Sequence, residues 1–133
     1  IFSKMICLKA PYFRTIKPLF IALRPGYCEI TMKKRRAVHN HIKSVHAIAM
    51  CNISELAAGT MLEATLPPSM RWIPKGMSVE YLKIARTDLK AMCEISTEGL
   101  DHPQELPMTV HVTDTSKAEV FRAVITMHIS EKR

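Results

Sequence analysis

One glutamate lies in the middle of an apolar stretch of the sequence, where an acid is unusual. Glu55 falls within residues 45–66, a run with no proline and a single glycine that is rich in good helix formers. Glutamate is rarely buried without a partner. A carboxylate held in such a place can activate water or attack a carbonyl carbon directly. Glu55 therefore belongs either to a structural network or to a catalytic site.

The element that must position Glu55 is a long helix, predicted from Val45 to Leu66. Ser44 can cap its first turn, because a serine oxygen accepts hydrogen bonds from the amides there. Pro67 and Pro68 end it, because proline cannot continue a helix. Apolar side chains occur on every side of this helix, which indicates burial. A single curved sheet cannot cover such a helix completely, so we expect a second subunit to cover the remainder.

Strand patterns occur on both sides of the helix in the sequence. Residues 27–33 alternate between apolar and polar side chains, after an apolar run at 19–23 and a turn or bulge at 24–26. Residues 67–76 are predicted to form a loop. Four further strand-like runs follow, at residues 77–85, 89–96, 106–113 and 120–129. Their short connections indicate antiparallel neighbours, so the sequence predicts an α+β fold in which one sheet packs against the helix.

The length of 133 residues favours one domain, spanning residues 1–133. Within it, residues 1–16 read weakly as helical turns broken by Pro11, and we expect this N-terminal segment to pack on the rest. The formal net charge of +7 favours an anionic partner, such as nucleic acid, a membrane surface or a phosphorylated cofactor. Nucleic-acid binding through the basic run at residues 33–36 ranks last, because the interleaved aromatic residues of single-strand binders are absent.

The four cysteines have no close pairing, so we expect reduced thiols in a cytoplasmic protein. No zinc-ligand spacing is present, and His39 and His41 would need a third ligand to hold a metal. We therefore expect no metal. No apolar run reaches the ~18 residues of a membrane span, so we expect no membrane association.

Three polar residues at fixed spacing carry a resemblance to a known family. His46 follows Asn40 by six residues, and Glu55 follows His46 by nine. This pattern resembles the hotdog-fold superfamily of acyl-CoA thioesterases, most of all the phenylacetyl-CoA thioesterase type, in a mostly uncharacterised subfamily. Two glycines follow the histidine in those enzymes, whereas Ala47 and Ile48 stand here. The resemblance implies an antiparallel sheet of five to six strands wrapped around one long central helix.

The resemblance also implies roles for these residues. Glu55 would be the base or nucleophile, and the amide of Ala47, or of Ile48 if the register shifts, would bind the developing oxyanion. Asn40 would orient the carbonyl or the water, and His46 would support the site. Hotdog proteins often hold coenzyme A phosphates near a turn that here carries Lys83, Arg86 and Lys90. Coenzyme A would enter as part of the substrate, with no other cofactor.

Helix geometry places a condition on this arrangement. The nine residues from His46 to Glu55 span ~13 Å of helix and ~180° of rotation, so Glu55 cannot face the amides of its own helix. The site would then form between two subunits of a homodimer, and further pairing into a tetramer stays open. Ile48 could narrow the acyl pocket or point into the core. The sequence thus predicts a thioester hydrolase, with a non-catalytic hotdog protein that binds acyl-CoA or lipid as the alternative.

Overall fold

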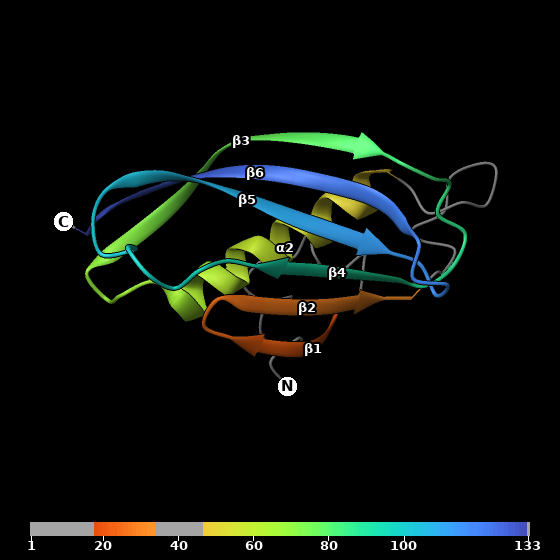
Figure 1. Ribbon diagram of the computed structural model, residues 1–133, viewed down its shortest axis with the longest axis horizontal. Coiled ribbons are helices and arrows are strands. Elements are labelled where there is room, and N and C mark those ends of the chain that lie inside the picture. Colours follow the sequence, from red (N-terminus) through yellow and green to blue (C-terminus); the bar gives the residue numbers. More distant parts are fainter. Residues whose placement is uncertain (1–17, 34–46, 133) are drawn as a thin grey trace.

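The computed structural model describes residues 18–33 and 47–132 of the chain (Figure 1). The elements are β1 (Leu19–Arg24), β2 (Tyr27–Met32), α2 (Ala47–Thr65), β3 (Met70–Tyr81), β4 (Leu89–Glu94), β5 (Gln104–Thr113) and β6 (Glu119–Glu131). The strands form one antiparallel sheet in the order β1-β2-β4-β5-β6-β3. The helix α2 lies along one face of this sheet and packs mainly on β2, β4 and β5. The predicted α+β arrangement, a sheet wrapped around one long helix, is confirmed.

The predicted elements agree with the observed ones to within a few residues, except at β3. The predicted helix is confirmed over its described part as α2, and the apolar run at residues 19–23 forms β1. The predicted N-terminal segment, residues 1–16, lies outside the described residues, as do Asn40 and His46. No helix among the described residues is long and apolar enough to cross a bilayer.

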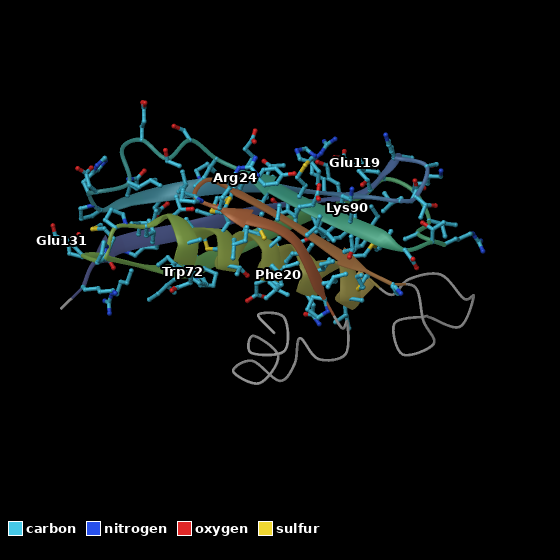
Figure 2. The ribbon with its side chains drawn as sticks, turned by 90° about the horizontal axis from the view of Figure 1, so that it is seen from below. Phe20, Arg24, Trp72, Lys90, Glu119 and Glu131 are labelled. Carbon is cyan, nitrogen blue, oxygen red and sulfur yellow. The ribbon has the colours of Figure 1, made fainter. Side chains whose placement is uncertain are left out.

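Alternation along the strands explains why α2 covers only one face of the sheet. Every second side chain of β2, β4 and β6 is buried, and these buried side chains form one core with the helix. In β4, Leu89, Ala91 and Cys93 are buried while Lys90 and Met92 are exposed. Figure 2 shows Lys90 on the far side of the sheet from α2 and Trp72 on the side of the helix. The molecule therefore has an inner face that packs on α2 and an outer face.

The turn between β1 and β2 ties the hairpin to the helix end. Gly26 has a φ of +82°, which glycine adopts without a steric cost. Its amide donates a hydrogen bond of 2.9 Å to Oγ1 of Thr65 at the end of α2. Its carbonyl accepts one of 2.8 Å from the amide of Ile95, just after β4. The turn predicted at residues 24–26 is confirmed, and it joins three elements.

The edge strand β3 differs from the prediction because it contains a β-bulge. Residues 67–76 were expected to form a loop, whereas β3 begins at Met70. The pairing with β6 shifts between Pro74 and Gly76, so that Lys75 is an extra residue on this strand. Proline, lysine and glycine in sequence suggest a break in a strand pattern, yet an edge strand tolerates proline because one side of it needs no ladder hydrogen bonds. The loop prediction is therefore wrong, for a reason that depends on the position of β3 in the sheet.

The bulge also changes which side chains of β3 face inward. Pro74 lies opposite Met127 and Met77 lies opposite Ile125, and both partners are buried on the inner face. Pro74 and Met77 are three residues apart, so a regular strand would have placed them on opposite faces. With Lys75 inserted, both lie on the side of the sheet that faces α2.

Candidate functional site

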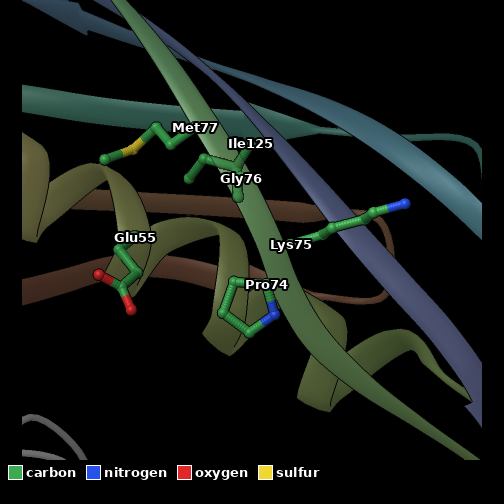
Figure 3. A pocket seen from close by; sticks show the side chains of 6 residues that line it. All are labelled: Glu55, Pro74, Lys75, Gly76, Met77 and Ile125. Atoms are coloured by element: carbon green, nitrogen blue, oxygen red, sulfur yellow. The ribbon is translucent and has the colours of Figure 1, made fainter.

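Glu55 lines a cavity between α2 and the edge strand β3. The cavity has a volume of about 220 Å³. Its other lining residues are Pro74, Lys75, Gly76, Met77 and Ile125 (Figure 3). Four of these belong to the bulged part of β3, and Ile125 of β6 lies directly opposite Met77. The bulge therefore builds most of the wall that faces the helix at Glu55.

Pro74, Met77 and Ile125 give this cavity apolar walls, and Lys75 is the charged lining residue besides Glu55. In Figure 3, Pro74 and Met77 lie on the side of β3 that faces Glu55, while Lys75 extends in the opposite direction. Lys75 forms an ion pair with Glu105 of β5. Within the described part of the chain, no hydrogen bond or ion pair of the Glu55 carboxylate is present. Nothing in that part of the chain supports the structural network considered for Glu55.

One stripe of α2 is left open by the sheet around Glu55. Ile48 is 63% exposed, and Cys51, Asn52 and Glu55 are half-buried. Their spacing of three or four residues places them on the same side of the helix. Toward the C-terminal end, Trp72 covers the same side of α2 at Gly59. The described residues of the sheet therefore cover one half of this stripe and do not cover the other half.

The structure describes α2 from Ala47 onward, and residues 34–46 lie outside the described residues. Ala47 and Ile48 are the first two described residues of α2. Ile48 is exposed, so the alternative that its side chain points into the core is wrong. Ala47 lies eight residues before Glu55, which corresponds to ~12 Å along the helix axis. The structure thus places the Ala47 amide and the Glu55 carboxylate too far apart to act on one atom within a single copy.

Cys51 lies one turn before Glu55 on the same stripe. Burial raises the pKa of the Cys51 thiol, and the negative charge of Glu55 raises that pKa further. Both effects favour the neutral thiol over the thiolate, which is the reactive form. Cys51 is consequently a weak nucleophile rather than an activated one.

The predicted phosphate-binding cations do not line the Glu55 cavity. Lys83 follows β3 and lies 3.5 Å from a carboxylate oxygen of Asp114. Lys90 projects from the outer face and lies 3.8 Å from Glu29. Arg86 is exposed in the loop between β3 and β4. A role for Lys83, Arg86 and Lys90 in phosphate binding stays a prediction, as do the roles of Asn40 and His46.

Sequence reasoning missed the residues of β3 and β6 that line the cavity. Met77 was expected to begin a strand, and Pro74 was expected in a loop. The available signal was the sequence Pro-Lys-Gly at residues 74–76 between two stretches with strand character, which is typical of a bulge. This signal predicts an irregularity but does not indicate which helix residue lies opposite it.

Comparison with known proteins places this chain in a family. Residues 1–129 match a family model described as "Domain of unknown function (DUF4442)". A search of curated proteins found no significant match. One solved structure, the structural-genomics target APC5556, is 50% identical with a TM-score of 0.92, and the match covers 98% of this chain and 88% of that chain.

Two more distant structures share the fold. PA5026 of Pseudomonas aeruginosa, described as a "Probable Thioesterase", is 18% identical with a TM-score of 0.90, covering 98% of this chain and 93% of that chain. The thioesterase HI1161 of Haemophilus influenzae is 11% identical with a TM-score of 0.80, and the match covers 96% of this chain and 87% of that chain. Identities this low establish the fold alone. The chain therefore has the hotdog fold that the resemblance implied, and it belongs to the family described as DUF4442.

Proposed function

We propose that this protein hydrolyses acyl thioesters, with Glu55 as the base or nucleophile. The observation that carries the proposal is that the Glu55 carboxylate lines an apolar cavity and is not engaged by another described side chain. A carboxylate in that setting is available to a water molecule or to a carbonyl carbon. The fold shared with a protein named as a thioesterase, HI1161, is consistent with this chemistry.

A second copy of the chain completes the proposed site. Thioester hydrolysis places negative charge on the carbonyl oxygen, and amides at a helix N-terminus stabilise such a charge. The Ala47 amide of one copy is ~12 Å along the helix from its own Glu55. Two α2 helices that pack antiparallel through the open stripe would bring each N-terminus beside the Glu55 of the other copy. A two-fold dimer of this kind contains two equivalent sites.

Acyl-coenzyme A is the proposed form of the thioester. The net charge of +7 favours an anionic ligand, and the coenzyme carries phosphates. Arg86, Lys83 and Lys90 are the proposed phosphate contacts, and the two lysines would exchange their carboxylate partners for the phosphates. Asn40 and His46 are proposed to orient the carbonyl and the attacking water from the segment before α2.

The test of Glu55 is hydrolysis of a panel of acyl-coenzyme A esters, followed with a thiol-reactive dye. Glu55→Gln should lower kcat by about 10²-fold or more, since the amide keeps the shape of the side chain and loses its basicity. Glu94→Gln, an exposed residue of β4, serves as the matched control and should leave kcat unchanged. Turnover that survives Glu55→Ala would overturn the assigned role. Saturable binding without turnover in the wild-type protein would favour the non-catalytic alternative.

The test of the shared site is the oligomeric state. We expect the protein to sediment as a dimer or a larger assembly, and Ile48→Glu should dissociate it and abolish turnover, because Ile48 lies in the open stripe. Ile73→Glu changes an isoleucine of similar exposure on the outer face of β3 and should leave turnover unchanged. A fully active monomer would contradict a site built from two copies.

A further inference from the structure

We propose that the cavity beside Glu55 is the subsite for the acyl group, that it takes a small, uncharged and apolar acyl chain, and that Met77 determines the length of that chain. This inference rests on the proposed thioester hydrolysis and adds to it the class of substrate. Three features of the cavity carry it: the inward direction of Met77, the buried position of Ile125, and the absence of an inward-facing cation among the described residues that line the cavity.

Met77 faces the cavity only because of the bulge in β3. The inserted Lys75 shifts the strand by one residue, so that Met77 lies opposite the buried Ile125 on the inner face. In a regular strand the same position would face outward, and Gly76 would face α2 in its place. The bulge therefore substitutes a long flexible side chain for an empty position in the wall opposite Glu55.

Two side chains that line the cavity, Ile125 and Met77, differ in how far they can move. Ile125 is 1% exposed and is held in the core beneath α2. Met77 is 43% exposed at the sheet edge. Methionine has three rotatable bonds and adapts to irregular spaces, so it is the side chain that a longer acyl chain would have to displace. Pro74 is rigid and limits the cavity on the other side of the bulge.

The cavity is small for a ligand site. Its volume of about 220 Å³ lies below the ~300–1,000 Å³ that is typical of pockets for drug-sized ligands. The remainder of a coenzyme A ester would have to lie outside it. The space next to Glu55 therefore matches a short acyl group in a single copy of the chain.

Among the described residues that line the cavity, the charge distribution disfavours an acyl group that carries its own carboxylate. Glu55 is the charged group that faces the cavity, and a second carboxylate beside it would be repelled. Lys75 contributes to the lining but directs its ammonium group to Glu105 on the outer face (Figure 3). No cation of the lining residues remains to bind a dicarboxylic acyl group, so an uncharged chain is favoured.

The experiment compares chain-length profiles of the wild-type protein, Met77→Ala and Met92→Ala. Met92 is an exposed methionine on the outer face of β4 and controls for the loss of a methionine side chain. The substrates run from acetyl- to dodecanoyl-coenzyme A, with succinyl-coenzyme A as the charged member. The matching thioether analogues, which cannot be hydrolysed, are measured by calorimetry. Melting temperatures establish that the variants are folded.

We expect the wild-type protein to prefer short chains and to discriminate against succinyl-coenzyme A. Met77→Ala should shift the preference toward longer chains, raising kcat/KM for octanoyl relative to acetyl by about 10-fold or more, whereas Met92→Ala should not. The thioether Kd values should shift in the same direction. An unchanged profile in Met77→Ala, or succinyl-coenzyme A used as well as butyryl-coenzyme A, overturns this inference while hydrolysis itself stands. If the protein hydrolyses none of the esters but its affinity for the thioether analogues depends on Met77, the proposed hydrolysis is overturned and the proposed acyl subsite is retained.

Discussion

The indole of Trp72 on β3 lies directly over Gly59 on α2. A β-carbon placed on Gly59 would be 2.9 Å from Cη2 of Trp72, and the indole Nε1 donates a hydrogen bond of 2.6 Å to Glu63. This contact joins the edge strand to the C-terminal half of the helix. It also closes that end of the space between α2 and β3, whereas the end at Glu55 stays open.

Gly59→Ala should destabilise the protein although alanine is the better helix former. The helix would gain ~1 kcal/mol, whereas the overlap with the indole should cost ~1–3 kcal/mol, because the ring must leave its position and its bond to Glu63. Urea denaturation should therefore show a net loss of about 1 kcal/mol. In a Trp72→Leu background the same substitution should be stabilising, since the ring is absent. A more stable Gly59→Ala protein with Trp72 present would contradict the contact.

Gly26→Ala should lower the free energy of unfolding more than Gly99→Ala does. The difference measures the steric overlap of the added β-carbon with its neighbours at Gly26. Both glycines have positive φ values, +82° and +74°, so alanine at either position should cost ~1–2 kcal/mol in backbone energy. A β-carbon at Gly26 would also lie 2.8 Å from the carbonyl oxygen of Ile95 and 2.9 Å from Cγ2 of Thr97, whereas none of the surrounding atoms lies within 4 Å at Gly99.

The overlap should add ~1–3 kcal/mol at Gly26, because the nearest atom belongs to the backbone and cannot rotate away. Free energies of unfolding from urea titrations would measure both variants under the same conditions. Equal losses of unfolding free energy at the two positions would contradict a tight contact between the β1–β2 turn and the backbone after β4.

The paired thiols of β2 and β4 should make the protein lose stability in alkali. Cys28 and Cys93 lie opposite each other in the sheet and are 0% and 1% exposed. Burial raises the pKa of both thiols from 9.0 to about 12. The unfolded chain therefore releases these protons first as the pH rises, so the stabilisation is complete below pH 9.0 and is lost between 9.0 and about 12.

The expected slope is about 1.4 kcal/mol per pH unit for each thiol within that interval. Urea denaturation at stepwise increasing alkaline pH would measure it. The double variant Cys28→Ala/Cys93→Ala serves as the reference, because tyrosine and lysine ionisation affects both proteins alike. If the free energy of unfolding fell equally with pH in both proteins, the two thiols would not titrate as buried groups.

Cys51 should react with iodoacetamide faster than Cys28 and Cys93, since it is the half-buried member of the three. The rate should keep rising as the pH increases past 9.0, because burial and the charge of Glu55 raise the pKa of this thiol. Glu55→Gln should increase the rate at a fixed pH below that pKa. Peptide mapping by mass spectrometry identifies the modified residue in a Cys7→Ser background. A slower reaction in Glu55→Gln would contradict the electrostatic coupling between the two residues.

The sequence by itself determined the elements and their class. The helix from Val45 to Leu66 followed from helix propensity and its proline boundary, and the strands followed from alternation, which is set by neighbours within a few residues. The resemblance of the Asn40, His46 and Glu55 spacing to that of hotdog thioesterases then implied the hotdog fold. These features are local in the chain, so local patterns were sufficient to predict them.

The tertiary structure decided what lies opposite Glu55. The extension of β3 back to Met70, the bulge at Lys75 and the inward direction of Met77 all depend on the pairing of β3 with β6, about fifty residues later in the chain. A shift of one residue in that pairing would exchange the two faces of the strand. Because this register arises from long-range contacts, the sequence pattern around residues 70–77 could not show which side chains meet the carboxylate.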